Sequence, residues 1–580
     1  NAARALKIDP EQLNVNQALT SFGIDSLMAV ELKNRVEQDL RVHLSIGALL
    51  QGRDVAQLAA ELLEQMTAEQ KPSATTPTSS TTSEYPLSST QEALWFLQQM
   101  APESTAYNVA VAMRATSSLD AAIARKTFET LLQRHDALRT TFRQQGERPL
   151  QQVRADFDVS FEEIDGTRWD DLELRRQLVA AAYAPFDLAH GPVARAYLVH
   201  VGPTESIFML NAHHLVIDGW SCWLLLNEFR ELYTAQARQK SVPTLLPPPA
   251  RYADFVRWQA ELLDSAEGER MWSYWKRELS GDLPVLRLFN SRPQGATQTF
   301  AGASHYFQLQ GQVIEGLRSL AQAEGTTLYT LLLSAFQVLL QRYTAQDDIL
   351  VGSPVAARPR AEFGDVVGCF FNAVVLRGDL SGDPTFKEFL RQMRTRVLGA
   401  LEHQDYPSHV LTQRLREELD HGQRPLFQVS FIMQKVSGVK QEDLSWQPVV
   451  LDRKAARAEL ELELIESGSS IEALLQYSTD MCDAQTAARL GHHYANLLRS
   501  ILVNPAARVS RLAILDATEQ QKLRTIHTRV AKDSVHEMFS RQAEKTPDKI
   551  VAIDAHGALT YRELNTQADK LANLIRGLTK

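Results

Sequence analysis

The sequence predicts a multidomain protein in which a small all-α unit precedes a large mixed α/β region. Three observations carry this prediction. At 580 residues with 44% hydrophobic side chains, the chain exceeds what one core can organise. Residues 67–84 are rich in Ser, Thr and Pro and bury too little apolar surface to order themselves, so they predict a flexible linker. Helical spacing dominates before this linker, whereas strand-like and helix-like segments alternate after it.

The first unit, residues 1–66, is expected to be a bundle of three or four helices. The stretch 26–39 places Leu27, Val30, Leu32 and Val36 near one face, and 55–66 repeats the helical pattern. Ser26 stands at a predicted helix start, where unpaired amides and the helix dipole would stabilise an attached phosphate. On the residues alone, an ordinary N-cap serine is the better supported of the two interpretations.

In the α/β region, residues 207–212 form an apolar run that predicts a buried strand leading into His213 and His214. Asp218 and Gly219 then turn the chain into a predicted helix over 220–233. If the strand continues through the histidines, their side chains point to opposite faces, one to a cavity and one to the core, and cannot share a metal ion. A buried Asp218 requires a cation or several amide donors. Two histidines satisfied by backbone carbonyls remain an equal alternative.

Composition excludes several classes of function. The net charge of −9 argues against a nucleic-acid partner. Cys222, Cys369 and Cys482 are widely separated, so we expect neither disulfides nor a metal site, and a cytoplasmic location. The apolar stretch 328–340 is too short for a membrane span and predicts a buried helix instead. The chain begins at Asn1 without a leader and ends inside a predicted helix, so we expect a piece of a longer protein.

The string Phe-Gly-Ile-Asp-Ser-Leu-Met-Ala-Val-Glu-Leu-Lys-Asn-Arg at 22–35 resembles the attachment motif of acyl and peptidyl carrier proteins. The resemblance implies a four-helix carrier, trimmed at its first helix, with 4'-phosphopantetheine attached to Ser26 by a phosphopantetheinyl transferase. The continuation after Ser26 is more similar to polyketide carriers than to those of peptide synthetases. The donor group is therefore either peptidyl or polyketide.

Residues 85–516 resemble the condensation domains of nonribosomal peptide synthetases, with the family's motifs in the family's order. These motifs are Ser-Ser-Thr-Gln-Glu-Ala-Leu-Trp-Phe-Leu at 88–97, Arg-His-Asp-Ala-Leu-Arg-Thr-Thr-Phe at 134–142, the HHxxxDG motif at 213–219, Tyr-Ala-Asp-Phe-Val-Arg-Trp-Gln at 252–259, Val-Gly-Cys-Phe-Phe-Asn at 367–372, His-Gln-Asp-Tyr-Pro at 403–407 and Arg-Pro-Leu-Phe-Gln-Val-Ser-Phe at 424–431.

This resemblance implies two chloramphenicol-acetyltransferase-like lobes, about 85–260 and 265–515, in a V-shaped pseudo-dimer with a tunnel between them. His214 matches the catalytic histidine, which deprotonates or orients the acceptor amine. His213 and Asp218 match structural residues, and Gly219 matches a small residue that keeps the tunnel open. We expect Arg358 to pair with Asp218. Arg139 and Asn372, each within a matching motif, are expected to give structural support.

Residues 534–580 include Leu-Thr-Tyr-Arg-Glu-Leu at 559–564, which resembles the first motif of an adenylation domain, after a linker at 517–533. The order carrier, condensation, adenylation implies peptide-bond formation between a donor on the upstream carrier and an aminoacyl group on a downstream carrier. Adenylation itself is not expected from this fragment. An epimerase relative fits the order less well, and a heterocyclase would carry two aspartates instead of the histidines. A docking platform without activity would look the same in sequence.

Overall fold

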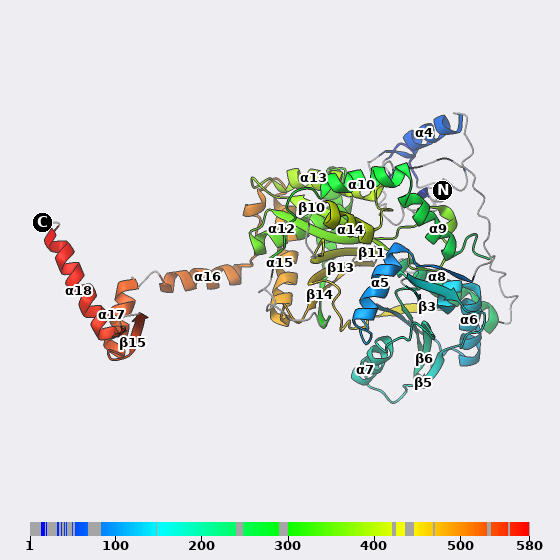
Figure 1. The fold of residues 1–580 in the computed structure, drawn as a ribbon, viewed down its shortest axis with the longest axis horizontal. Coiled ribbons are helices and arrows are strands. Elements are labelled where there is room, and N and C mark those ends of the chain that lie inside the picture. The colour runs from blue at the N-terminus through cyan, green and yellow to red at the C-terminus, as the bar shows by residue number, and fades with distance from the viewer. Residues whose placement is uncertain are drawn as a thin grey trace. The chain divides into compact units, whose positions relative to one another are not determined.

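A computed structural model describes residues 53–67, 83–146, 148–238, 247–288, 300–419, 425–435, 446–467, 470–530, 535–554 and 557–578, with scattered positions from 13 to 49. The chain forms two compact units, residues 1–512 and 513–580. Figure 1 shows the elements in chain order.

Of the predicted helical bundle, the structure describes one helix in full, α4 (Val55–Thr67), which confirms the helix expected over 55–66. Leu32 and Val36, which were expected on one apolar face, are both buried. Ser26 and the string around it lie outside the described residues. The phosphopantetheine site therefore stays a prediction.

The first lobe is built on a five-stranded sheet with the order β12-β2-β7-β6-β5, in which only β5 and β6 run parallel. The same part of the sequence also forms a three-stranded sheet with the order β1-β4-β3. The elements are β1 (Glu84–Pro86), α5 (Ser89–Met100), β2 (Asn108–Ala115), α6 (Ala121–Arg134), the 3-10 turn η3 (Asp136–Arg139), β3 (Thr140–Gln145), β4 (Arg148–Val153), β5 (Phe161–Asp165), α7 (Asp171–Ala182), β6 (Ala194–Gly202), β7 (Glu205–His213), α8 (Gly219–Ala237) and α9 (Tyr252–Leu263).

Strand β7 is largely apolar because both of its faces are covered. Phe208 and Leu210 belong to the main core of the lobe. Ile207 and Met209 pack with residues of α7 on the opposite face. A strand that is buried on both faces is apolar along its whole length, and this run is what predicted the strand over 207–212. The structure confirms that strand as β7. The predicted helix after the turn is also confirmed, as α8.

The second lobe has a six-stranded sheet with the order β10-β9-β11-β13-β14-β8, in which β11 runs parallel to both of its neighbours. Its elements are α10 (Ala266–Glu278), β8 (Gly302–Leu309), α11 (Gly311–Ala323), α12 (Leu328–Thr344), β9 (Asp348–Val355), η4 (Ala361–Phe363), β10 (Asn372–Asp379), α13 (Phe386–Glu402), α14 (Ser408–Leu419), β11 (Val429–Lys435), β13 (Leu460–Ser467), β14 (Ser470–Ser478), α15 (Ala484–Val503) and η5 (Val509–Arg511).

Helix α12 is the apolar stretch that was expected to be a buried helix, and residues 330–340 of it are buried. In the part of the chain that the structure describes, no single helix is long and apolar enough to cross a membrane. Helices α11 and α12 reach that length and apolarity only as a pair, which is bent by 104°.

The two lobes are not contiguous in sequence, which corrects the simple division expected at 260–265. Strand β12 (Trp446–Val449) comes from the sequence of the second lobe but pairs with β2 in the first sheet, with Val449 opposite Ala112. Phe363 and Phe370 likewise belong to the core of the first lobe. Pairing of β12 covers the edge that β2 would otherwise expose, which gives the crossing a physical reason.

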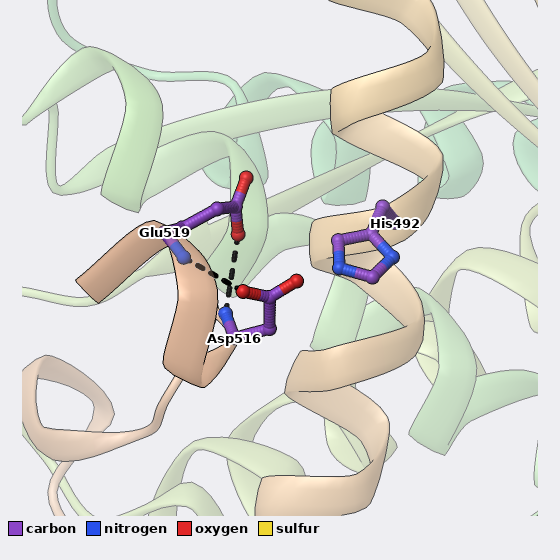
Figure 2. A group of neighbouring side chains, drawn as sticks. All are labelled: His492, Asp516 and Glu519. Carbon is purple, nitrogen blue, oxygen red and sulfur yellow. Dashed lines mark hydrogen bonds between the residues drawn. The ribbon is translucent and has the colours of Figure 1, made fainter. Parts of the chain in front are cut away.

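The second unit consists of α16 (Ala517–Val530), α17 (Val535–Lys545), β15 (Ile550–Asp554), β16 (Gly557–Thr560) and α18 (Tyr561–Leu578). Helix α16 occupies most of the expected linker 517–533, so that stretch is helical. Its start is fixed by a reciprocal pair of hydrogen bonds, because the Glu519 amide donates to Asp516 and the Asp516 amide donates to Glu519 (Figure 2).

Candidate active site

The two histidines lie where the central strand of the first lobe ends. Strand β7 stops at His213, opposite Asn108 of β2, and His214 begins the following turn. The strand alternation that was expected to separate the two side chains therefore does not extend to His214. The His214 amide donates to the Tyr107 carbonyl at 2.8 Å, which fixes the backbone at this position.

Each imidazole has a different environment. His213 is 1% exposed, and its Nδ1 accepts a hydrogen bond from the Leu215 amide at 3.2 Å. Its ring also meets Phe186 edge to face, with centroids 6.3 Å apart. His214 is 8% exposed, and its ring lies 4.7 Å from that of Phe371, which the second half of the domain contributes. Both histidines are therefore buried, and His214 is the one at the junction of the lobes.

Both imidazoles are neutral at pH 7. Burial, together with the positive charge of Arg457, lowers the pKa of His214 to about 4, although Asp218 acts in the opposite direction. Burial lowers the pKa of His213 to about 3, with smaller contributions from His214 and Arg457. Desolvation disfavours the charged imidazolium, so each ring can accept a hydrogen bond at neutral pH.

Asp218 is buried and joins the two lobes. Its side chain caps helix α8 by accepting from the Ser221 amide at 2.8 Å, and it also accepts from the Phe370 amide at 3.2 Å. The Arg358 guanidinium, which follows β9, donates to the two Asp218 oxygens at 2.7 and 3.3 Å. The expected pairing of Asp218 with Arg358 is therefore present in the structure. Every oxygen of this buried carboxylate has a donor.

Arg358 has further partners that hold it in place. Its Nη2 donates to the Ser221 hydroxyl at 3.0 Å and to the Val366 carbonyl at 3.1 Å. The guanidinium carbon lies 4.2 Å from the centroid of the Phe370 ring. Its side chain is 0% exposed, and that of Asp218 is 3% exposed. This ion pair is an ordered, fully desolvated junction.

Gly219 is exposed at the start of α8, directly after Asp218. A Cβ added at this position would meet nothing within 4 Å. The fold itself therefore does not require glycine here. A requirement for a small residue would have to come from something that binds beside the histidine motif.

The two expected support residues hold loops away from the histidines. Asn372 donates to the carbonyls of Gln404 and Tyr406 at 2.8 and 2.7 Å and accepts from the Ser408 amide, so it fixes the turn before α14. Arg139 pairs with Asp136 and donates to the Arg154 carbonyl. The structure brings neither of them into contact with the histidine motif.

A segment that the motifs did not reveal also reaches the site. Residues 450–459, here called the crossover segment, connect β12 in the first sheet to β13 in the second. Arg457 of this segment donates through Nε to the Ala106 carbonyl at 3.0 Å, and its guanidinium carbon lies 5.7 Å from the centroid of the Tyr107 ring. No spacing in the sequence relates Arg457 to His214, because only β12 pairing brings them together.

The same segment carries a second arginine with a different role. Arg453 lies 3.3 Å from a carboxylate oxygen of Glu461 and 2.8 Å from one of Glu463, both on β13. Ser430 and Gln434 of β11 donate to these two glutamates, respectively. Nearby Glu463 and Glu461 raise the pKa of Arg453, so this guanidinium stays charged. The crossover segment is thereby tied to the second sheet.

Comparison with known proteins gives the same order of carrier and condensation domains. A family model described as "Condensation domain" matches residues 81–524. A second model, described as the C-terminal ACP domain of the highly reducing polyketide synthase sdgA, matches residues 2–77. The expected similarity of the N-terminal unit to polyketide carriers is supported by this second match.

Among curated relatives, tyrocidine synthase 3 of Brevibacillus parabrevis is 32% identical over 575 residues, which cover 98% of this chain and 9% of the relative. Chondramide synthase cmdD of Chondromyces crocatus is 34% identical over 502 residues, which cover 84% of this chain and 13% of the relative. The chain thus spans about a tenth of the length of these relatives.

Solved structures show the same two-lobe fold. The first condensation domain of the calcium-dependent antibiotic synthetase, solved with substrate analogue 3a, matches with a TM-score of 0.65 at 19% identity, over 75% of this chain and 99% of that one. The condensation domain of the monacolin K polyketide synthase MokA matches with a TM-score of 0.65 at 22% identity, over 74% and 99%. With the family model matching most of its length, the chain belongs to the condensation-domain family.

Proposed function

We propose that this chain forms an amide bond between an acyl or peptidyl donor carried on Ser26 and an aminoacyl acceptor on a downstream carrier. One observation supports this most directly. A neutral imidazole, His214, lies at the junction of the lobes beside a buried Asp218–Arg358 pair in which both carboxylate oxygens have donors. A site held this firmly around an uncharged hydrogen-bond acceptor is suited to orienting an amine.

The 4'-phosphopantetheine arm, when attached to Ser26, supplies the donor as an activated thioester. Gly219 is exposed and an added Cβ would meet nothing within 4 Å, so no side chain blocks the approach of such an arm at this position. A phosphopantetheinyl transferase would be the partner that modifies Ser26. The match to a carrier family over residues 2–77 supports this proposal.

His214 is better suited to orienting the amine than to removing its proton. An α-amine has a pKa of about 7.7 to 8.0, whereas that of His214 is lowered to about 4. Proton transfer to so weak a base is unfavourable. Accepting a hydrogen bond from a neutral amine remains possible, and holding two reactants in line contributes up to about 7–11 kcal/mol. His213 and Asp218 would serve by fixing the turn that presents His214.

The C-terminal residues 534–580 are proposed to be the start of an adenylation domain. The alignment with tyrocidine synthase 3 extends over 98% of this chain, which supports the order carrier, condensation, adenylation. In that order the condensation domain elongates a chain and takes its acceptor from further downstream.

The first test is attachment of the arm. Incubation with coenzyme A and a promiscuous phosphopantetheinyl transferase should add one phosphopantetheine to the wild-type chain and none to Ser26→Ala, as measured by intact-protein mass. Addition to both proteins would place the attachment elsewhere. Addition to neither would remove the carrier role.

The second test is transfer. A promiscuous phosphopantetheinyl transferase transfers butanoyl-phosphopantetheine from butanoyl-coenzyme A to Ser26 and releases adenosine 3',5'-bisphosphate. The loaded chain is mixed with aminoacyl-pantetheine thioesters of the twenty amino acids, and N-acylated products are measured by mass spectrometry. We expect His214→Ala to lower the rate by about 10²-fold, the size of a lost positioning contact. His190→Ala, at an exposed histidine, is the matched control and should react like wild type. Equal rates in His214→Ala and wild type would leave His214 without a role, and a wild type that forms no product would favour a docking platform.

A further inference from the structure

Arg457 reaches the neighbourhood of His214 from the opposite end of the domain sequence. It lies on the crossover segment, whose β12 end is paired into the first sheet and whose β13 end belongs to the second. Its Nε donates to the Ala106 carbonyl at 3.0 Å. The carbonyl of the next residue, Tyr107, accepts a hydrogen bond from the His214 amide at 2.8 Å. Two hydrogen bonds and one peptide unit therefore connect Arg457 to the backbone of His214.

The charge of Arg457 is not neutralised locally. Among the described residues no carboxylate forms an ion pair with Arg457, whereas Arg453 of the same segment faces Glu461 and Glu463. The guanidinium rests instead on a neutral carbonyl and above the Tyr107 ring. Arg457 is exposed, so solvent weakens its charge, but no opposite charge cancels the part that acts on neighbouring titratable groups.

Two charged groups act on the His214 imidazole from the elements packed around it, Asp218 at the start of α8 and Arg457 on the crossover segment. The neighbouring titratable group is His213 at the end of β7, whose own pKa is lowered by burial and by His214. Phe371, the aromatic neighbour of His214, carries no charge. Asp218 favours the protonated imidazole, but its own charge is already bound by Arg358. Arg457 is thus the charge that opposes protonation of His214, in addition to burial.

We propose that Arg457 is a positioning residue for His214, which braces residues 106–107 under the His214 backbone and keeps an unpaired positive charge beside the imidazole. This inference rests on the proposed amide-forming function. It assigns to the crossover segment a direct part in the site, in addition to joining the lobes. Pairing of β12 with β2 holds the crossover segment where Arg457 reaches the Ala106 carbonyl. The site is therefore complete only when this strand pairing has formed.

The ionisation of His214 tests the inference without substrate. The full chain is labelled with ¹³Cε1-histidine, the His214 resonance is assigned by its loss in His214→Gln, and its chemical shift is followed from pH 8.5 down to the lowest pH at which the chain stays folded. In wild type and in Arg457→Lys, which keeps the charge, we expect the resonance to stay that of a neutral ring. In Arg457→Gln protonation should begin at a higher pH, because an opposing charge is gone.

The control removes a neighbouring charge instead. Lys454→Gln deletes a cation from the same crossover segment, and Lys454 is not among the groups that act on His214. It should leave the His214 titration as in wild type. An unchanged His214 titration in Arg457→Gln would overturn the inference, and so would an equal shift in Lys454→Gln. If His214 titrates in Arg457→Lys as it does in Arg457→Gln, the positive charge of residue 457 is not the cause of the shift, and the inference is overturned.

A transfer assay then separates this inference from the proposed function. With butanoyl-loaded chain and the aminoacyl-pantetheine mixture, the transfer rate of Arg457→Gln should fall relative to wild type as the pH is lowered from 7 towards 5, and Arg457→Lys should restore the wild-type profile. A rate reduced equally at all pH values would point to a purely structural role and overturn the inference. A wild type without product at any pH would instead count against amide formation, and the titration would still decide on Arg457.

Discussion

Two arginines connect the halves of this domain to buried carboxylates, and they do so in different ways. Arg358 is completely buried and pairs with a single carboxylate, Asp218. Arg453 has about a third of its side chain exposed and pairs with two, Glu461 and Glu463. The first pair has one charge of each sign and a donor for every oxygen, whereas the second has one more negative charge than positive.

The difference indicates which junction must stay rigid. A charge pair removed from water needs good geometry and hydrogen-bond donors for its carboxylate oxygens, and both Asp218 oxygens have donors. A partly hydrated arginine between two carboxylates can exchange partners with little loss. The rigid junction lies directly beside the histidine motif, and the more adaptable one lies on the crossover segment. We infer that the Asp218–Arg358 junction is the more rigid of the two.

The largest loss of stability is expected when Arg358 is removed. Arg358→Ala should lower the free energy of unfolding by about 3–5 kcal/mol, because Asp218 would keep its charge in a buried site without a cation. Urea denaturation measures this loss. Arg360→Ala, at an exposed arginine two residues away, should change stability by less than about 0.5 kcal/mol. If Arg358→Ala and Arg360→Ala have the same stability, the rigid junction does not exist.

The histidines beside the rigid junction give a pH dependence of known sign. Their pKa values in the folded chain, about 4 for His214 and about 3 for His213, lie below the usual value near 6.5. The unfolded chain therefore binds more protons, so stability should fall as the pH drops from 6.5 towards 4, by roughly 1 kcal/mol per histidine and pH unit. In denaturation at pH 7, 6 and 5, His213→Gln should show a flatter decline, whereas His190→Gln should follow wild type. Parallel curves would contradict a neutral buried pair.

At the adaptable junction the expected loss is smaller. Arg453→Gln should cost about 1–3 kcal/mol at pH 7, because Glu461 and Glu463 then face each other without a cation. Lys454→Gln serves as the control on the same segment. A loss as large as that of Arg358→Ala, measured in the same urea titration, would show that both junctions are equally rigid.

The smallest structural effect is expected at Gly219, which lies beside the rigid junction and has open space around its Cα. Gly219→Ala should leave the free energy of unfolding unchanged within about 1 kcal/mol, because the added Cβ meets no atom within 4 Å and alanine is a better helix former. Amide formation should nevertheless slow, since the open space is needed by tethered substrates. Thermal unfolding and the transfer assay measure the two effects. Unchanged transfer would remove the proposed role of Gly219.

Much of the site could be predicted from the sequence because its parts are local. The apolar run 207–212, the Asp-Gly turn and the helix after it follow one another directly, and each is present in the structure. The motif resemblance added Arg358 as the partner of Asp218, and the structure contains that pair. The position of His214 was less predictable, because strand β7 ends one residue earlier than strand alternation required.

Arg457 and β12 mark the limit of sequence-based prediction. Strand β12 is four residues long, and no local pattern shows that it completes the sheet of the other lobe. The expected lobe boundaries therefore placed the crossover segment entirely in the second lobe. The expected linker at 517–533 was similarly assigned from composition, and most of it is helix α16.

The sequence by itself determined the family, the order of the carrier and condensation domains and the residue types of the histidine motif, because these depend on residues at short spacings. Only the tertiary structure decided which contacts fix that motif and which protonation state its histidines adopt. The pKa of His214 depends on burial and on Arg457, and the Asp218 charge depends on Arg358, which belongs to the other lobe. Desolvation and Coulomb interactions act through space, so they are set by the packing of segments far apart in the chain and not by the local sequence.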